Sequence, residues 1–205
     1  MSKEIELKLA MEDRGEYQKL LRDPQVFDGT YDTYKLEAIY YDTAQFALTR
    51  RKVSIRLRKE NGQLVATMKY GGGVRDGLHL RREINRRVDE EVMDISHFPE
   101  KEKELAMLIG NEALKPIVTT SIIRKLKRVV FGQSLLELSL DKGCVMALGR
   151  QVPILELELE LLDGSPDDLY RFREECLAGY HFQTDNLSKF QKGMSLYGDL
   201  PETSR

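Results

Sequence analysis

The sequence predicts an α+β fold in which an antiparallel sheet curls so that charged side chains line its interior. Charged and aliphatic residues alternate in seven segments, which is the two-residue period of β-strands. Acidic side chains gather on some of these strands and basic side chains on others. Four segments with helical signals lie between or after the strands and are available to cover their apolar faces.

The first expected strand, residues 4–9, places Glu4, Glu6 and Lys8 on one face and three aliphatic side chains on the other. A helix is expected at 12–21, because the aspartate–proline pair that follows disfavours helical geometry. The chain therefore begins with one charged strand and one covering helix.

Residues 53–59 and 64–69 are two further strands, and the Asn61-Gly62 dipeptide between them is typical of a hairpin turn. The strand at 78–85 follows the glycine-rich residues 71–77. This glycine run lacks the GxxxxGK[ST] spacing of a P-loop, so we expect a flexible hairpin tip at the rim of the sheet.

The second half of the chain repeats the pattern, with strands expected at 123–130, 135–141 and 154–161. The last of these carries three glutamates on one face and four leucines on the other. Helices are expected at 99–114, 165–178 and 186–197. A serine cap, a proline and two aspartates mark the start of the second of these helices.

The composition is that of one domain, which we place at residues 1–198, with a frayed tail at 199–205. The 32 basic and 34 acidic residues nearly cancel, which argues against nucleic acid as a partner. No signal peptide or membrane-spanning stretch is recognisable, so a cytoplasmic protein is expected. Two isolated cysteines and three scattered histidines give no zinc-binding or disulfide pattern.

Two arrangements of these strands are open: a flat sheet with its charged face in solvent, or a curled sheet with the charges inside. Like charges two residues apart stand roughly 7 Å from one another and repel unless a ligand neutralises them. A divalent cation neutralises clustered carboxylates, and a polyanion neutralises clustered arginines and lysines. A metal-bound polyphosphate does both, and oxygen ligands without histidine or thiolate suit Mg²⁺ or Mn²⁺.

Several motifs, taken in order, resemble those of the CYTH family, also called triphosphate tunnel metalloenzymes. The resemblance spans nearly the whole chain and is strongest to the bacterial inorganic triphosphatases. The motifs are Glu4-x-Glu6-x-Lys8, Tyr40-Tyr41-Asp42-Thr43, Arg56-x-Arg58, Thr67-Met68-Lys69, Arg81-x-Glu83, Arg124, Glu137-x-x-x-Asp141, Glu156-x-Glu158-x-Glu160 and Ser188-Lys189.

The resemblance implies a closed eight-stranded antiparallel barrel with a charged interior and helices packed outside. It implies metal ligation by Glu4, Glu6, Glu156 and Glu158, with Asp141 and Glu160 as supplementary ligands. It implies phosphate binding by Lys8, Arg56, Arg58, Lys69, Arg81 and Arg124. The expected catalytic residues are Glu137, Asp141 and Lys189, the last of which also contacts the substrate. Asn85 departs from family members that carry an acidic residue there, which leaves a second metal at that strand open.

The function implied is metal-dependent hydrolysis of tripolyphosphate to pyrophosphate and phosphate, by a monomer or homodimer. In-line attack by a metal-bound or carboxylate-oriented water is expected, with the proton acceptor left open. Three alternatives share the same tunnel: a nucleoside or thiamine triphosphatase, a class IV adenylate cyclase, and a polyphosphate-binding module without catalysis. Tyr40 and Tyr41 are interpreted as packing residues rather than ligand-binding ones.

Overall fold

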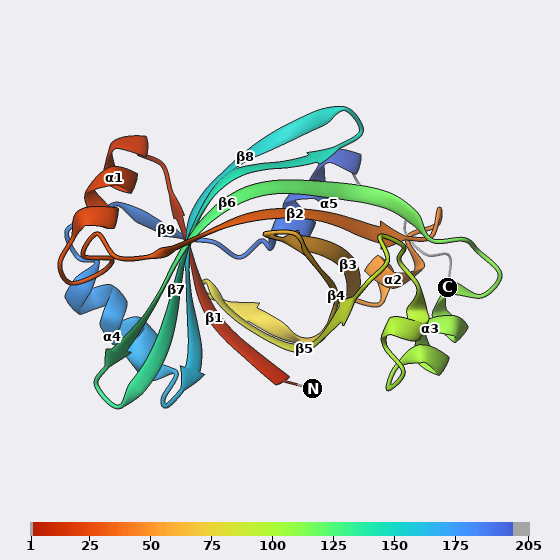
Figure 1. The fold of residues 1–205 in the computed structure, drawn as a ribbon, viewed down its shortest axis with the longest axis horizontal. Helices are drawn as coiled ribbons and strands as arrows, with labels where there is room; N and C mark the ends of the chain where they lie inside the picture. Colours follow the sequence, from red (N-terminus) through yellow and green to blue (C-terminus); the bar gives the residue numbers. More distant parts are fainter. Residues whose placement is uncertain (1, 199–205) are drawn as a thin grey trace.

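A single antiparallel sheet closes on itself to form the body of the molecule (Figure 1). The computed structural model describes residues 2–198, so the tail expected at 199–205 lies outside the described residues. The strands follow the order β5-β4-β3-β2-β6-β7-β8-β1, and pairing of β1 with β5 closes the barrel. The short strand β9 adds to β1 beyond the barrel. The eight-stranded barrel is thus confirmed, with one extra strand.

The strands of the sheet differ widely in length. Their bounds are β1 Ser2–Met11, β2 Asp32–Asp42, β3 Val53–Glu60, β4 Gln63–Arg75, β5 Leu78–Val88, β6 Lys115–Phe131, β7 Ser134–Ala147, β8 Arg150–Asp163 and β9 Phe182–Thr184. Strands β2 and β9 are not among the segments predicted from alternation. The long strands β6, β7 and β8 extend beyond the barrel, and helices lie beside their extended ends (Figure 1).

The helices are shorter than the sequence predicts. Their bounds are α1 Arg14–Arg22, α2 Ala47–Arg50, α3 Glu102–Ile109, α4 Asp167–Cys176 and α5 Lys189–Met194, with 3₁₀ turns at Ile95–His97 and Ser195–Tyr197. Helix α3 ends at Gly110, whose positive φ of 62° suits glycine. None of the helices within residues 2–198 has the length and apolar character needed to span a lipid bilayer.

Two hydrophobic cores lie between the outer face of the barrel and its helices. Leu157 and Leu159 of β8 are fully buried in a core that includes Leu20 of α1 and Phe172 of α4. A second core joins the outer sides of β3, β4 and β5 to α3, with Leu105 fully buried. In β1, β3, β4, β5, β7 and β8 the aliphatic side chains therefore face outward under a helix, which leaves the charged side chains inside.

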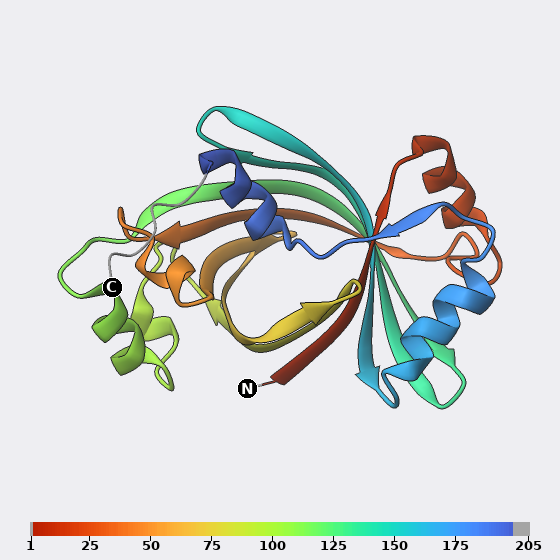
Figure 2. The ribbon, with the colours of Figure 1, turned by 180° about the vertical axis from the view of Figure 1, so that it is seen from behind.

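Helix α5 differs from the other helices because it packs against the inner face of the barrel. Phe190 and Met194 belong to a core with Val118 of β6 and Val145 of β7. Both valines lie an even number of residues from the inward-facing side chains of their strands, so they face the barrel interior as well. A Cβ atom on Gly193 would lie 2.3 Å from a methyl of Val118, so glycine permits this close approach. Figure 2 shows α5 in front of β2, β6 and β8. The expectation that helices pack outside thus holds for α1, α3 and α4 but not for α5.

The glycine run at 71–73 lies inside β4 rather than at a hairpin tip, which corrects the prediction for this segment. The pairing of β4 with β5 is irregular between Tyr70 and Gly73. Gly72 has a positive φ of 80°, and a Cβ atom there would lie 1.7 Å from the carbonyl oxygen of Leu80. The run therefore forms a bulge that needs glycine, and the hairpin turn itself comes at Asp76 and Gly77.

The Tyr40-Tyr41-Asp42-Thr43 motif has a structural role at the end of β2. Asp42 is fully buried, and its carboxylate accepts hydrogen bonds from the backbone N–H groups of Thr43, Leu48 and Thr49. The Thr49 hydroxyl adds a further bond of 2.6 Å. Asp42 therefore holds the turn from β2 into α2 in place.

Candidate active site

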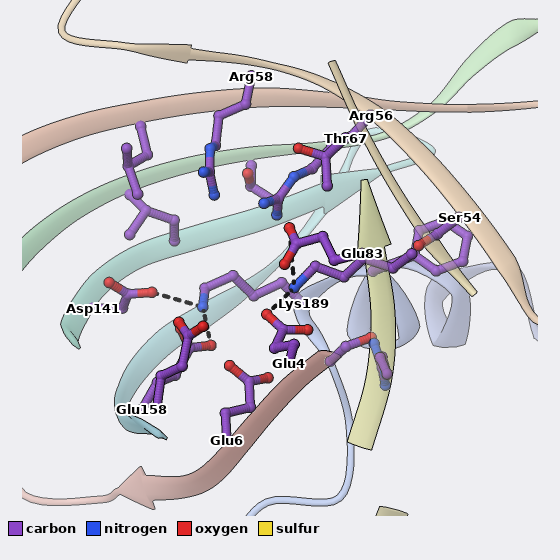
Figure 3. Close-up of a pocket in the computed structure, with 18 of the residues that line it drawn as sticks. Glu4, Glu6, Ser54, Arg56, Arg58, Thr67, Glu83, Asp141, Glu158 and Lys189 are labelled. Carbon is purple, nitrogen blue, oxygen red and sulfur yellow. Dashed lines mark hydrogen bonds and ion pairs between the residues drawn. The ribbon is translucent and has the colours of Figure 1, made fainter. Parts of the chain in front are cut away.

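A polar cavity of about 200 Å³ lies inside the barrel. Every strand from β1 to β8 contributes side chains to it, together with the start of α5. Its lining residues are Glu4, Glu6, Lys8, Leu36, Tyr40, Ser54, Arg56, Arg58, Thr67, Lys69, Arg81, Glu83, Asn85, Thr120, Ile122, Arg124, Glu137, Asp141, Glu158, Glu160, Ser188, Lys189 and Phe190. Figure 3 shows Arg56 and Arg58 on one side, opposite Glu4, Glu6 and Glu158.

One group of carboxylates in the barrel is matched by buried cations. Asp141, Glu156 and Glu158 each offer an oxygen, and these oxygens lie within 4.8 Å of one another. Lys189 Nζ lies 2.7, 2.5 and 2.9 Å from the oxygens of these three residues, in that order. Lys8, only 1% exposed, contacts Glu156 at 2.9 Å and Glu158 at 2.7 Å.

Two further cations complete this matched group. Arg124 donates from Nε and Nη2 to both oxygens of Asp141 at 2.7 Å, and Nη2 also reaches Glu158 at 2.6 Å. Lys192, one turn after Lys189 on α5, contacts Glu156 at 2.7 Å. The arrangement ties α5 to β7 and β8 from inside the barrel.

The ionisation of the matched group reflects this balance of charge. Burial lowers the pKa of Lys8, but Glu156 and Glu158 outweigh burial and hold that pKa well above its usual value. Burial raises the pKa of Glu158, yet Lys189 and Lys8 hold it well below its usual range. These groups are therefore ionised as stable pairs at neutral pH.

A second group of carboxylates, Glu4, Glu6 and Glu160, has too few cations around it. Burial, with the charges of Glu158 and Glu4, raises the pKa of Glu6. Burial, together with the charges of Glu4 and Glu6, raises the pKa of Glu160 to about 8. Lys69 contacts Glu4 Oε1 at 2.5 Å, but Glu4 Oε2 is buried and has no hydrogen-bond partner among residues 2–198.

The opposite wall carries positive charge that is incompletely matched. Burial, together with the charge of Arg56, lowers the pKa of the Arg58 guanidinium to about 10. Arg58 pairs with Glu60, and Arg56 Nη1 donates to the Tyr40 hydroxyl at 3.1 Å. The Nε atoms of both arginines are buried and lack an acceptor within the described part of the chain. This wall is suited to an anion that supplies several oxygens.

The residues present fit a divalent cation. Clustered carboxylates with raised pKa values and a buried oxygen without a partner are what a site for Mg²⁺ or Mn²⁺ offers. Glu6 and Glu160 have the raised pKa values, and Glu4 beside them has the buried oxygen without a partner among the described residues. In the group of Asp141, Glu156 and Glu158, lysine and arginine side chains occupy the oxygens that a metal would use.

The structure brings the residues singled out from the sequence into one barrel interior. Glu156 lies beneath the cavity, fully buried under Lys189, rather than on its wall. Glu137 lies opposite Glu160 in the β7–β8 register and accepts a hydrogen bond from Arg128 at 2.9 Å. The strand parity that placed the charged residues inside is therefore correct for every strand to which it was applied.

Other residues of the site escaped the sequence analysis. Lys192 was not singled out, although its spacing of three from Lys189 places both lysines on one face of a helix. Tyr40, interpreted as a packing residue, packs on Phe190 with ring centroids 5.1 Å apart and also lines the cavity. Thr120 also lines the cavity, but it lies before the strand expected at 123–130, because β6 begins at Lys115.

Comparison with known proteins agrees with this architecture. Residues 2–192 match the CYTH domain family. An inorganic triphosphatase of Haemophilus influenzae is 31% identical over 209 residues, which cover 96% of this chain. The matched region is 55% of that relative, so the chain spans about half the length of the curated protein.

Two solved structures share the fold at low sequence identity. A Hippeastrum protein, considered an adenylyl cyclase and reported to have a dominant triphosphatase activity, superposes with a TM-score of 0.69 at 21% identity. The alignment covers 94% of this chain and 95% of that one. A Bacillus halodurans protein considered an adenylate cyclase gives a TM-score of 0.57 at 21% identity, with 94% and 98% covered. Because the family match covers nearly the whole chain and the barrel closes as that family requires, the chain belongs to the CYTH family.

Proposed function

We propose that the protein hydrolyses inorganic triphosphate to pyrophosphate and phosphate inside the barrel, with Mg²⁺ or Mn²⁺ as cofactor. One observation carries the proposal. The same cavity holds carboxylates whose pKa values burial raises and buried arginine Nε atoms that lack an acceptor among the described residues, on facing walls (Figure 3). A metal-bound triphosphate would supply a cation to the carboxylates and oxygen acceptors to the arginines. The name of the Haemophilus relative supports the same activity.

The cationic side chains would bind and orient the phosphates. Arg56, Arg58, Lys69 and Arg81 come from β3, β4 and β5 and line the cavity. Their charges would neutralise the non-bridging oxygens, which spread negative charge in phosphoryl transfer. Lys189 would contribute from the opposite side at the start of α5. Burial acts to lower the pKa of Lys189, but the charges of Asp141 and Glu156 outweigh burial and raise that pKa above its usual value. Lys189 would therefore keep its proton throughout turnover.

Glu4, Glu6 and Glu160 would hold the metal, and Glu158 lies close enough to raise the pKa of Glu6. When bound there, the metal would polarise phosphoryl oxygens and lower the pKa of a coordinated water. Asp141, Glu156 and Glu158 stay candidate metal ligands. Their contacts with Lys8, Arg124 and Lys189 favour instead a role in holding these three cations in place. This division refines the ligand set that the resemblance implies.

Glu137 is the best candidate among the described carboxylates for orienting the attacking water. It lines the cavity beside Glu160 on the neighbouring strand and accepts a hydrogen bond from Arg128, whose side chain is exposed. Asp141 is a weaker candidate because both its oxygens already accept from Arg124. A water held by Glu137 would lose its proton toward that carboxylate as it attacks the terminal phosphorus.

The size of the cavity favours an inorganic substrate over an organic triphosphate. Pockets that enclose an organic ligand of drug size measure about 300–1,000 Å³. The barrel cavity, at about 200 Å³, is smaller. Its apolar lining, Leu36, Ile122 and Phe190, lies where α5 packs, so packing already uses these side chains.

Phosphate release from tripolyphosphate, ATP and thiamine triphosphate, each with Mg²⁺, Mn²⁺ or EDTA, tests the proposal. We expect metal-dependent release that is fastest from tripolyphosphate. Cyclic AMP formed from ATP would instead indicate a cyclase. Tight binding of tripolyphosphate without turnover under any metal would indicate a polyphosphate-binding module.

A further inference from the structure

His79 is a buried side chain that the proposed reaction does not use, yet it lies beside the phosphate-binding residues. It is fully buried on β5, two residues before Arg81. One ring nitrogen, Nε2, lies 2.8 Å from the backbone carbonyl oxygen of Asp185. The other, Nδ1, lies 3.3 Å from Arg81 Nη2.

These two partners fix the tautomer of the ring. A carbonyl oxygen only accepts, so Nε2 must carry the hydrogen and donate it to Asp185. A guanidinium only donates, so Nδ1 must be bare and accept from Arg81. The imidazole is therefore neutral, with its hydrogen on Nε2, and burial, which lowers its pKa, favours the same state.

Arg81 is held from two sides through a single nitrogen. Its Nη2 atom also donates to Gln191 Oε1 at 3.3 Å, so the two N–H groups of Nη2 serve His79 and Gln191. In the part of the chain that the structure describes, both hydrogen bonds of Arg81 start from Nη2. The three remaining N–H groups, on Nε and Nη1, are left for a ligand in the cavity that Arg81 lines.

The segment that His79 contacts leads directly to Lys189. Asp185 N–H donates to the carbonyl of Lys8 at 2.9 Å, and Asn186 accepts from Gly77 N–H at 2.9 Å. Gln191 belongs to the capping box of Ser188, which begins α5. We call residues 185–188 the strap, since they run from β9 across the β4–β5 turn to α5.

We propose that His79 is a positioning residue, which orients the Arg81 guanidinium toward the cavity and fastens it to the strap that carries Lys189. The inference rests on the proposed function, because Arg81 and Lys189 are phosphate-binding residues only in that function. The two hydrogen bonds of one neutral imidazole thus set the relative position of a strand arginine and a helix lysine. The neutral imidazole suits this pairing, since its one donor and one acceptor lie on opposite sides of the ring and satisfy both partners.

Substitutions can remove the two hydrogen bonds separately. His79→Gln places an amide where Nε2 lies and can keep the donor to Asp185, but it loses the acceptor for Arg81. His79→Leu loses both bonds. The matched control is His97→Gln, because His97 makes the same kind of Nε2 contact, 3.0 Å from the carbonyl of Val92, and is not among the residues that line the cavity.

The first measurement is calorimetric binding of tripolyphosphate in EDTA, which requires no turnover. We expect His79→Gln to weaken binding about tenfold, the loss expected for one hydrogen bond to a charged group. In an Arg81→Met background the same change should have less than a twofold effect. His97→Gln should bind as the unmodified protein does. Equal losses in both backgrounds would show that His79 acts on general stability, and would overturn the inference.

The second measurement is the ¹⁵N chemical shifts of the His79 ring at pH 6–8. We expect a neutral ring with hydrogen on Nε2 throughout. Hydrogen on Nδ1, or a cationic ring, would overturn the inference, since neither state can accept from Arg81. This result does not depend on catalysis, so failure of the proposed function and failure of the role of His79 give different outcomes.

Discussion

Replacing Glu6 with glutamine should stabilise the metal-free protein, whereas the same change at Glu156 should destabilise it. Both carboxylates lie inside the barrel, 7% and 0% exposed. Burial and the charges of Glu158 and Glu4 raise the pKa of Glu6, so its charge is unfavourable without a metal. Burial also acts to raise the pKa of Glu156, but Lys189 and Lys8 outweigh it and lower that pKa. Glu6→Gln therefore removes an unfavourable buried charge, whereas Glu156→Gln breaks ion pairs with buried lysines.

The contacts set the size of each effect. Glu156 lies 2.9 Å from Lys8, 2.5 Å from Lys189 and 2.7 Å from Lys192. Removing one partner of a buried pair costs about 3–5 kcal/mol. Because Lys8 and Lys189 keep Glu158, we expect the lower end, a loss of about 3 kcal/mol. That loss lowers Tm by roughly 6–12 °C in a protein of this size.

Glu6→Gln should raise the free energy of unfolding by about 0.5–2 kcal/mol, as is common when a functional residue held at a cost to stability is replaced. Metal-dependent hydrolysis of tripolyphosphate should fall by about 10²–10³, the loss typical of one electrostatic group at a reacting centre. Function and stability would thus change in opposite directions at Glu6.

Thermal and urea unfolding in EDTA at pH 7.5 measure the two stabilities, and phosphate release with Mg²⁺ measures activity. Repeating the unfolding with Mg²⁺ should reverse the order of the unmodified protein and Glu6→Gln, because only the former gains from metal binding. A fall in stability of similar size for both variants would refute the assignment of matched and unmatched carboxylates. Activity near the original level in Glu6→Gln would refute its role as a ligand.

Three further predictions concern the other parts of the site. Arg58→Met should raise the free energy of unfolding by about 0.5–2 kcal/mol, because burial disfavours this cation and lowers its pKa to about 10. It should also weaken tripolyphosphate binding at least tenfold in calorimetry, and unchanged binding would contradict this prediction. Glu160 keeps its proton up to about pH 8 when folded but only to about 4.5 when unfolded, so the folded state binds more protons and stability falls as pH rises through this window. Glu160→Gln should reduce that fall by on the order of 1 kcal/mol in urea unfolding at pH 5, 6.5 and 8, and an unchanged pH dependence would count against it. Gly193→Ala should lower the free energy of unfolding by about 1–3 kcal/mol and lower the catalytic rate, since the added methyl would lie 2.3 Å from Val118 and displace α5. Full activity would show that the site does not depend on the position of α5.

The sequence predicts the charged interior because the information is local. In the segments 4–9 of β1 and 155–161 of β8, inward residues are charged and outward residues are aliphatic, so two-residue alternation fixes the face of each side chain there. Strand β2 escapes this rule. Its inward residues Leu36, Ala38 and Tyr40 are apolar, while Lys35 and Glu37 are exposed, which reverses the pattern of the other strands.

The reversal in β2 has the same physical cause as the unexpected position of α5. An apolar inner surface made by Leu36, Tyr40 and Val118 can be buried only if something apolar enters the barrel, and Phe190 and Met194 of α5 do so. Neither half of this contact predicts the other from sequence, because β2 and α5 are about 150 residues apart in the chain. The pairing becomes apparent only once the barrel is closed.

This apolar contact also explains which carboxylates are matched. Docking Phe190 inside the barrel carries Lys189 and Lys192, three residues apart on one helix face, to Glu156 at 2.5 and 2.7 Å. Glu160, one pleat further along β8 from Glu158, lies beyond the reach of these lysines and keeps a pKa of about 8. The division of the interior into an anchored half and a half that awaits a cation therefore follows from how far α5 enters the barrel. A change that withdraws α5, such as Gly193→Ala, should lower the pKa of Lys189 and raise that of Glu156 together, which NMR titration of the two side chains can follow.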